Sequence, residues 1–470
     1  MKSLAFHLVA SGFVCLLAAA GTAQAQTLPL IAVGTLDQSS AGSFSDLSGL
    51  TYPLENGVLA NELGGMGSAL AYAGGDTFLA LPDRGPNANE FNDAVDNTVS
   101  YVNRFHTVTM DLWPNTSGSG LPFMLMPHLD STTLLWSAQP LVYGTGEGLG
   151  IGSGVPPINK THARYYFTGR SDNFDAAQNS GDPMDARFDT EGLRVSNDGE
   201  KVFISDEYGP YIYEFNRNTG KRLHAYKLPD MFYVKHPAPV GDDEISGNTA
   251  GRTANKGMEG LAITPDGKTL VGIMQNALIQ DAAEGGDAAN LLRIVTIDIA
   301  SGRVMHQFGY LLTNGSGVSE ILALNEHEFL VDERKGKGLG DGSKAKVKQL
   351  FKIDLNGATD VGDMDGTAAA AHAVSKTLFV DLVDSLVAAG YSTSLIPSKI
   401  EGIAIGPDVK NGGKTVHTLW VANDNDFLES VADPDGNIVM NPNEFFVFAF
   451  TDADLDGSLL MQQKFAKKCK

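Results

Sequence analysis

Cysteine is scarce in this chain, which has 470 residues and two cysteines. Cys15 lies in an apolar N-terminal stretch, and Cys469 is the next-to-last residue. We expect Cys15 to be removed with that stretch, which leaves one thiol and excludes an internal disulfide. Neither Cys nor His recurs at the spacing of zinc ligands. The folded chain must therefore be stabilised by packing, together with a different metal if one is bound.

Positive charge is also scarce, since 34 Lys and Arg residues face 56 Asp and Glu residues and the formal net charge is −22. Nucleic acids and anionic membranes are bound by basic surfaces, so neither is an expected partner. The same acidic excess is compatible with bound divalent cations. We expect the protein to act as a monomer.

Long apolar runs are limited to the N-terminus, where Leu4–Ala20 follows Lys2 and precedes Ala23-Gln24-Ala25. This run is short for a membrane span and is typical of a secretory signal peptide with an A-x-A cleavage site. We therefore predict a signal peptide at 1–25, a mature domain at 26–463 and a basic tail at 464–470. The location is then secreted or periplasmic, and the mature net charge becomes −23, because Lys2 is the one charged residue removed.

A pattern of strand openings is repeated along the chain. Three clear copies begin with Glu-Gly, at Glu191, Glu259 and Glu401, and looser copies begin at Ser48 and Ser319. After each opening, a second strand ends in acidic or amide residues. These ends are Pro82-Asp83-Arg84, Ser205-Asp206-Glu207, Gln275-Asn276, Asp332-Glu333-Arg334 and Asn423-Asp424. A repeat of this length that returns carboxylates to the same place predicts a ring of blades.

The repeat predicts an all-β fold, a β-propeller with six blades of four antiparallel strands. Alternating apolar residues and Asp-Gly or Ser-Gly turns give four strands after Glu191 and again after Glu259. Five blades follow from the visible copies, and residues 121–185 are expected to hold a degenerate sixth. The strand Leu30–Leu36 is expected to pair with Phe445–Phe450 and close the ring. A helical pattern is expected over Thr377–Ala389, in an insertion between blades.

Propeller geometry brings these openings and ends together. The first residue of an inner strand and the end of the second strand lie at the same mouth of the channel. Carboxylates gathered there would repel one another, and Ca²⁺ relieves such repulsion by binding six to eight oxygens. The expected metal ligands are Asp83, Glu191, Asp206, Glu259, Asn276, Glu320, Asp332, Glu333, Glu401, Asn423 and Asp424.

Basic residues lie beside these acids in the sequence, as Arg334 and Lys399 illustrate. Cations placed among metal-bound carboxylates are suited to a small anionic substrate such as a phosphoester, because Arg binds phosphate oxygens in pairs. The candidate catalytic residues are Glu191, Glu259, Asp206, Glu207, Arg187, Lys256 and Arg84.

Several of these strings resemble a known family. The strings that look like the phytase-like, "esterase-like activity of phytase" domain of secreted bacterial proteins are Ala80–Asn87, Asp189–Leu193, Ser205–Gly209, Asn255–Pro265, Val331–Arg334 and Ile400–Ile405. The resemblance covers roughly residues 40–450. It implies a β-propeller related to calcium-dependent phytases, with phosphoester or ester hydrolase activity. Two openings, at Ser48 and at Ile321, depart from the Glu-Gly pattern, and their blades are expected to complete the ring without binding metal.

Some motifs have a purely structural explanation. A single Glu-Gly pair is often a turn device, with Gly supplying backbone freedom, but three copies that share a partner strand favour a site. The stretch Asp452-x-Asp454-x-Asp456-Gly457 is similar to the start of an EF-hand loop. Its twelfth position is Gln463 rather than Glu, so an acidic turn is favoured over a calcium site.

Three functions of different classes remain open. The first is a calcium-dependent phosphoester hydrolase, which the basic residues favour. The second is a metal-dependent lactonase or carboxylesterase, which would act without a serine nucleophile of the G-x-S-x-G type, because that motif is absent. The third is a non-catalytic propeller in which the acidic ring is a structural calcium site, and unfolding on chelation would favour it.

Overall fold

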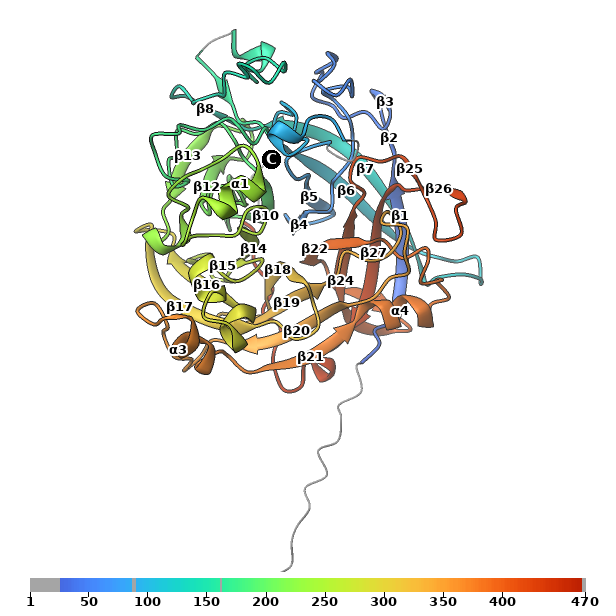
Figure 1. The fold of residues 1–470 in the computed structure, drawn as a ribbon. Helices are drawn as coiled ribbons and strands as arrows, with labels where there is room; N and C mark the ends of the chain where they lie inside the picture. The colour runs from blue at the N-terminus through green and yellow to red at the C-terminus, as the bar shows by residue number, and fades with distance from the viewer. Residues whose placement is uncertain (1–25, 87–89, 161–162, 467–470) are drawn as a thin grey trace, which may run out of the picture.

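Five antiparallel sheets surround a central axis, so the fold is a β-propeller (Figure 1). The computed structural model describes residues 26–86, 90–160 and 163–466. The predicted signal peptide at 1–25 and the last four residues of the predicted tail lie outside the described residues. No described helix is long and apolar enough to cross a membrane.

The blades are numbered in chain order, and their strands are given from the axis outward. Blade 1 contains β4 (Ala69–Tyr72), β5 (Thr77–Leu81), β6 (Arg104–Pro114) and β7 (Phe123–Leu134). Blade 2 contains β10 (Thr190–Val195), β11 (Lys201–Asp206), β12 (Ile212–Asn216) and β13 (Arg222–Tyr226). Blade 3 contains β14 (Met258–Ile263), β15 (Thr269–Met274), β16 (Leu291–Asp298) and β17 (Arg303–Leu311). Blade 4 contains β18 (Gly317–Ala323), β19 (Glu328–Arg334), β20 (Lys348–Asp354) and β21 (Lys376–Asp381). Blade 5 contains β22 (Lys399–Ile405), β24 (Lys414–Asp424), β27 (Asn443–Phe450) and β1 (Leu30–Leu36).

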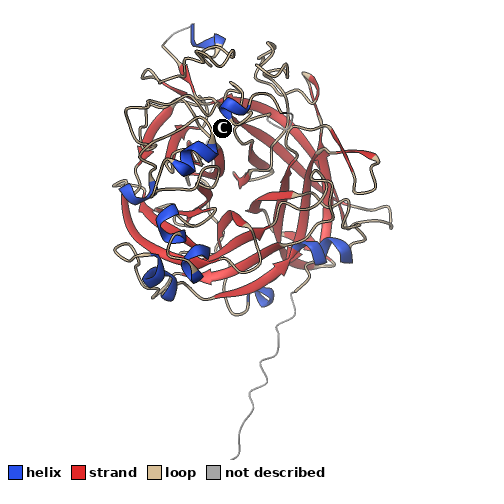
Figure 2. Ribbon diagram, in the orientation of Figure 1, coloured by secondary structure: helices blue, strands red, loops and turns tan. Residues whose placement is uncertain are grey.

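The remaining elements lie in the connections between these strands, except for one 3₁₀ turn, η5, which follows the last strand (Figure 2). The short strands are β2 (Gln38–Ser39), β3 (Gly42–Ser43), β8 (Trp136–Ser137), β9 (Tyr165–Tyr166), β23 (Val409–Asn411), β25 (Ser430–Ala432) and β26 (Ile438–Met440). The α-helices are α1 (Gly241–Ser246), α2 (Ile279–Ala282), α3 (Gly366–Ala371) and α4 (Leu382–Ala388). The 3₁₀ turns are η1 (Asp93–Val95), η2 (Pro157–Lys160), η3 (Asp230–Phe232), η4 (Gly286–Asn290) and η5 (Asp452–Leu455).

The ring has five blades, and the prediction of six was wrong. Residues 123–134 form β7, the outer strand of blade 1, and the rest of the segment 121–185 is loop apart from the two-residue pairing of β8 with β9. The inner strand β4 contacts both β10 and β22, which leaves no space for another blade between blades 1 and 2. The long insertion has the length of a blade, but it folds mainly as loops, and some of its residues, such as Phe167 and Arg170, are fully buried.

The inner strand of blade 1 also differs from the prediction. Residues 48–50 lie in a loop, and β4 is preceded by Gly67-Ser68. Ser68 therefore takes the place in blade 1 that was expected for Ser48. The apolar side chain of Leu50 explains the strand-like pattern, because it is buried in a small cluster with Tyr101 and Phe427.

Closure of the ring is as predicted. The first strand, β1, pairs antiparallel with β27, with Gly34 opposite Phe445 and Thr35 opposite Glu444. Blade 5 is thus built from both ends of the described chain, and its outer strand is the most N-terminal one. Unfolding of this blade requires the two ends of the chain to separate.

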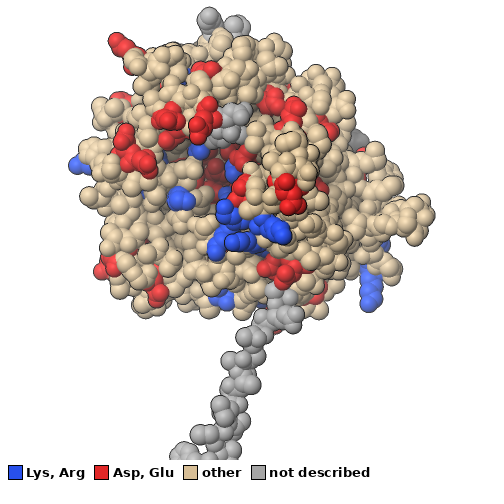
Figure 3. Space-filling model, turned by 45° about the vertical axis from the view of Figure 1, so that its right-hand side comes forward, with Lys and Arg blue, Asp and Glu red and all other residues tan. Residues whose placement is uncertain are grey.

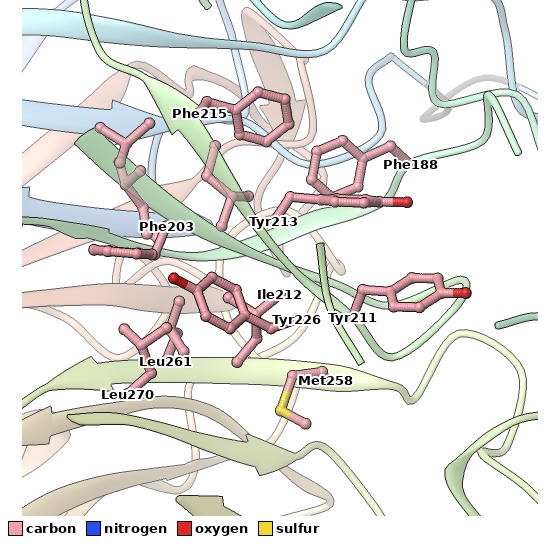
Figure 4. Close-up of a cluster of buried hydrophobic side chains, with 14 of the residues drawn as sticks. Phe188, Phe203, Tyr211, Ile212, Tyr213, Phe215, Tyr226, Met258, Leu261 and Leu270 are labelled. Carbon is pink, nitrogen blue, oxygen red and sulfur yellow. The ribbon is translucent and has the colours of Figure 1, made fainter. Parts of the chain in front are cut away.

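Apolar side chains fill the space between neighbouring blades. In the cluster drawn in Figure 4, aromatic residues of blade 2 pack against Phe188, which precedes β10, and the Phe188 and Tyr213 ring centroids are 5.0 Å apart. Leu261 and Leu270 of blade 3 belong to the same cluster. Such packing of alternating β-strand residues is the main source of stability in this fold.

Close approach of the inner strands explains why Gly follows Glu. A Cβ atom at Gly192 would lie 2.6 Å from the Leu261 Cβ in blade 3, and one at Gly260 would lie 2.7 Å from the Ile321 nitrogen in blade 4. At Gly402, a Cβ would lie 2.9 Å from the backbone of Ala69 in blade 1. The glycines are required by packing around the axis rather than by a turn conformation.

Two further expectations concern loops. The predicted helix at Thr377–Ala389 is half right, because β21 occupies its first part and α4 begins only after Asp381, whose side chain accepts a hydrogen bond from the Val383 nitrogen (2.9 Å). At the EF-hand-like stretch, Lys352 Nζ donates to the Leu455 oxygen (2.5 Å) and to Ser458 Oγ (2.7 Å). A lysine ammonium group therefore binds this acidic turn.

The C-terminal segment crosses the mouth of the channel at which the inner strands end. The Met461 nitrogen donates to Leu324 (2.8 Å), Gln463 Nε2 donates to Val195 (2.6 Å), and the Ala466 nitrogen donates to Asn197 (2.8 Å). The segment thus joins blades 2 and 4, and its packing continues past Gln463.

Removal of residues 461–470 tests this role. We expect the truncated protein to fold but to lose about 2–4 kcal/mol of unfolding free energy, since it loses several hydrogen bonds worth roughly 1 kcal/mol each. Urea unfolding followed by tryptophan fluorescence measures the change. An unchanged unfolding midpoint would show that the segment does not stabilise the ring.

Candidate functional site

A cavity of about 220 Å³ opens at the mouth where the inner strands begin. Figure 3 shows acidic and basic side chains together in a hollow of the surface. All five blades contribute to its wall. The described lining residues are Ser68, Asp83, Arg84, Glu191, Glu207, Asn255, Lys256, Glu259, Gln275, Arg334, Lys399, Glu401 and Asp424.

β-Bulges direct the repeated glutamates into this cavity. In blade 3, Met258 pairs with Met274 and Gly260 pairs with Ile273, which leaves Glu259 as the extra residue. Blade 5 has the same irregularity at Glu401. A bulge turns the side chain of its extra residue away from the regular alternation. The Glu-Gly repeat is therefore a bulged residue followed by a close-packed glycine.

In blade 4 the bulge lies one residue earlier than expected from the repeat, in which Glu320 was matched to Glu191, Glu259 and Glu401. Here Val318 pairs with Glu333 and Glu320 pairs with Asp332, so Ser319 is the bulged residue. Glu320 consequently occupies the position that is glycine in blades 2, 3 and 5. A shift of one residue moves a strand side chain to the other face, which removes Glu320 from the cavity.

Glu320 instead forms an ion pair in the channel. Its carboxylate lies 3.1 Å from Arg194 of blade 2 and accepts a hydrogen bond from the Leu261 nitrogen (3.0 Å). Arg194 also donates to the Ile321 oxygen (2.9 Å) and to the Leu70 oxygen (3.2 Å). Burial raises the pKa of Glu320 to about 7, although Arg194 opposes the change. The pair connects four blades across the axis.

Three carboxylates form a buried cluster on one side of the cavity. One oxygen from each of Asp189, Glu191 and Glu207 lies within 4.8 Å of the others. Among the described residues, Glu207 Oε1 and Glu259 Oε2 are buried without a hydrogen-bond partner. Buried charges without partners are unfavourable, and hard oxygen donors are the ligands that hard cations prefer. This cluster could bind a metal ion.

The pKa shifts agree with crowding of negative charge. Burial raises the pKa of Glu191 well above its usual value, and repulsion from Glu259 adds to the effect. Burial, followed by repulsion from Asp189, raises the pKa of Glu207 to about 7. Asp83 behaves in the same way, because burial and then the carboxylate of Asp424 raise its pKa. A bound cation would remove much of this repulsion.

Basic side chains hold the carboxylates of neighbouring blades together. Arg84 Nη1 lies 2.8 Å from Asp189 Oδ2 and also contacts Asn255. Arg334 of blade 4 pairs with Glu401 and lies 3.8 Å from Glu259.

Blade 5 supplies the remaining pairs. Lys399 Nζ lies 2.8 Å from Asp424 Oδ2 and also pairs with Asp426. Burial alone would lower the pKa of Lys399, but the carboxylate of Asp424 raises it well above its usual value. The ammonium group therefore stays charged beside the cavity.

About half of the residues predicted from the sequence line the cavity. These are Asp83, Arg84, Glu191, Glu207, Lys256, Glu259, Glu401 and Asp424. The other predicted residues do not line the cavity. Each of them either contacts another part of the fold or is buried. These are Arg187, Asp206, Asn276, Glu320, Asp332, Glu333 and Asn423.

The contacts of Arg187 and Asp206 explain their absence from the wall. Arg187 is buried, lies 3.5 Å from Glu244 and stacks on the Phe174 ring at 4.6 Å. Asp206 accepts hydrogen bonds from the nitrogens of Asp189 and Tyr208, each at 3.1 Å. Both residues shape the loop that carries Glu207 without reaching the cavity.

Of the other residues outside the wall, the side chains of Glu333, Asn423 and Asn276 form hydrogen bonds elsewhere, and that of Asp332 does not. Glu333 accepts a hydrogen bond from Tyr310 (2.7 Å) and pairs with Lys376. Asn423 Oδ1 accepts from the Glu444 nitrogen (2.6 Å), and Asn276 donates to the Ser316 oxygen (3.2 Å). Asp332 pairs with Glu320 in the β18–β19 register and is fully buried, and neither of its carboxylate oxygens has a hydrogen-bond partner among the described residues.

Besides Arg334 and Lys399, four residues of the site were not among the predicted ligands and catalytic residues: Ser68, Asp189, Asn255 and Gln275. Asp189 lies two residues before Glu191, a separation that places side chains on one face of a strand. Gln275 precedes Asn276, and the strand alternation did not show which amide faces the cavity. No sequence signal marked Ser68, because it lies outside the Glu-Gly repeat.

Substitution of Glu320 tests its structural role. We expect Glu320→Gln to lower the unfolding free energy by about 3 kcal/mol, because Arg194 is left as a buried charge without its partner. The double variant Arg194→Met/Glu320→Met, which removes both charges, should be more stable than Glu320→Gln. Chemical unfolding measures both. Full stability of Glu320→Gln, with weakened calcium binding, would instead identify Glu320 as a metal ligand.

Comparison with known proteins identifies the family. A family model described as phytase-like, esterase-like activity of phytase, matches residues 61–427. An uncharacterized secreted protein of Arthroderma benhamiae is 33% identical over 138 residues. That match covers 27% of this chain and 27% of the relative, so the chain spans about a quarter of the relative's length.

The matches among solved structures are distant in both sequence and structure. A luciferin-regenerating enzyme is 10% identical, with a TM-score of 0.32 and coverage of 86% of this chain and 97% of that one. A putative 6-phosphogluconolactonase from Bacteroides uniformis is 14% identical, with a TM-score of 0.30 and coverage of 81% and 88%. The family model, in contrast, matches most of the chain. The chain therefore belongs to the phytase-like family, whose description is "esterase-like activity of phytase".

Proposed function

We propose that the protein is a secreted hydrolase of small phosphoesters that depends on calcium bound in the cavity. The observation that carries this proposal is the buried cluster of Asp189, Glu191 and Glu207, with Arg84 paired to it. Membership of the phytase-like family supports ester hydrolysis by a propeller.

The donor set fits calcium. Asp189, Glu191, Glu207 and the partner-free Glu259 Oε2 would hold the ion, since Ca²⁺ binds six to eight oxygens from carboxylates, carbonyls and water. When bound, such an ion polarises an ester oxygen and makes water a better nucleophile. Burial raises the pKa values of Glu191 and Glu207, and a bound cation would favour their ionised forms.

The basic side chains of the cavity wall are suited to binding an anionic group of a substrate, such as a phosphate. Arg84 and Arg334 reach the cavity from different blades, and Arg donors bind phosphate oxygens in pairs. Lys256 and Lys399 add further positive charge. The position of these groups in one small cavity would orient a phosphate against the acidic cluster.

A lysine-rich loop would guide an anion to the mouth. Lys335, Lys337, Lys344 and Lys346 lie between β19 and β20, in the loop that follows Arg334, and the last three are exposed. In a chain whose net charge is −22, this loop is a local region of positive charge. Such regions raise the association rate of anionic ligands.

Hydrolysis of a lactone or carboxylic ester is the second candidate. Six acidic and four basic side chains line the cavity among the described residues, and this acidic excess favours a less charged substrate. The third alternative, a binding propeller with structural calcium, requires the ion for folding rather than for turnover.

Glu191→Gln tests the leading proposal. We expect this variant to keep its fold but to lose most phosphate release, at least about 100-fold in kcat/KM, because a ligand and a charge are removed where electrostatic stabilisation is large. Calcium affinity, measured by titration calorimetry, should fall as well. The matched control is Glu200→Gln, an exposed residue in the turn between β10 and β11. Wild-type turnover and calcium affinity in Glu191→Gln would contradict the proposed site.

A further inference from the structure

Every described residue that lines the cavity is polar or charged. All thirteen described lining residues carry a hydroxyl, an amide, a carboxylate, an ammonium or a guanidinium group. The volume of about 220 Å³ is below the usual range for drug-sized ligands and corresponds to roughly seven waters. A ligand that fills this space must form hydrogen bonds on most of its surface.

The cavity is also closed along the axis. The Arg194–Glu320 pair is buried in the channel beneath the mouth, with side-chain exposures of 6% and 0%. On the far side of this pair, a cavity of about 60 Å³ is lined by Arg194 and by residues 460–463 of the C-terminal segment. A long ligand therefore cannot pass through the ring, and the substrate enters and leaves through one mouth.

Neutral groups lie among the charges of the wall. Gln275 accepts from Lys256 Nζ at 3.5 Å, and Asn255 holds Arg84 through its side-chain oxygen. Asn255 has a left-handed backbone with φ of +54°, a strained conformation that concentrates at functional sites. Amide groups both donate and accept, so they are suited to the hydroxyl groups of a ligand.

The charges of the wall limit the number of anionic groups. Six acidic and four basic described side chains give a formal net charge of −2 when all are ionised, which one divalent cation would neutralise. One phosphate can be placed against the basic groups of this wall. Several phosphates would bring repulsion that the wall cannot balance.

We propose that the substrate is a compact polyhydroxylated compound with a single phosphate ester, such as a sugar or polyol monophosphate, rather than an alkyl phosphate or a polyphosphate. This inference rests on the proposed hydrolase function. An alkyl phosphate of the same length would bury the amide and charged groups without replacing their hydrogen bonds to water. Sites that bind a substrate hydroxyl discriminate against analogues without it by factors of up to about 10⁴–10⁵.

Titration calorimetry in calcium chloride tests the preference directly. The probes are glucitol 6-phosphate, hexyl phosphate of the same carbon number, and inositol hexakisphosphate. We expect glucitol 6-phosphate to bind at least about 100-fold more tightly than hexyl phosphate. Equal affinities would overturn the hydroxyl requirement, and tighter binding of the hexakisphosphate would overturn the single-phosphate limit.

A pair of variants connects the preference to the wall. Gln275→Leu should reduce the affinity ratio of glucitol 6-phosphate to hexyl phosphate by about tenfold, because one hydroxyl partner is replaced by an apolar group. The matched control is Gln139→Leu, an exposed glutamine outside the cavity, which should leave the ratio unchanged. An unchanged ratio in Gln275→Leu, with circular dichroism like that of the wild type, would contradict the inference.

Phosphate release separates this inference from the proposed function. Selective binding of glucitol 6-phosphate without hydrolysis of any phosphoester would support the polyhydroxylated ligand and contradict the hydrolase. Hydrolysis of hexyl phosphate as fast as glucitol 6-phosphate would support the hydrolase and contradict the polyhydroxylated substrate.

Discussion

The close approach of five inner strands around one axis is the constraint on which the rest of the structure depends. There is no space for a side chain at Gly192, Gly260 or Gly402, because the next blade lies against each of them. The preceding glutamates occupy bulges that turn their carboxylates towards one mouth. Packing at the axis thus produces the ring of charge that forms the site.

This ring is electrostatically unfavourable when it is unbalanced. Burial raises the pKa values of Glu191, Glu259 and Asp83, and neighbouring carboxylates raise them further. Arg334 balances part of the charge by pairing with Glu401 of the next blade, and Lys399 does so by pairing with Asp424 within blade 5. The oxygens without partners account for the affinity for a divalent cation that we propose. Stability and function are therefore linked at the same residues.

Much of the fold could be predicted from residue patterns, and less of the site. The pairing of Leu30–Leu36 with the last strand was predicted because a ring of blades must close, whereas the blade count was wrong, because a long insertion resembles a blade in length alone. The position of Glu320 depended on a bulge shifted by one residue, which the sequence does not show. Arg187 was assigned from its closeness to Glu191 in sequence, but a contact with Glu244 on α1 draws it away. Tertiary contacts of this kind have no local signal.

The most direct test of the account is phosphate release by the purified protein from a panel of sugar and polyol monophosphates, measured in calcium and then in excess chelator. The account predicts release in calcium, loss of release in chelator with the protein still folded, and recovery when calcium is restored. Equal release in chelator, or no release in calcium from any ester in the panel, would contradict a calcium-dependent phosphoester hydrolase.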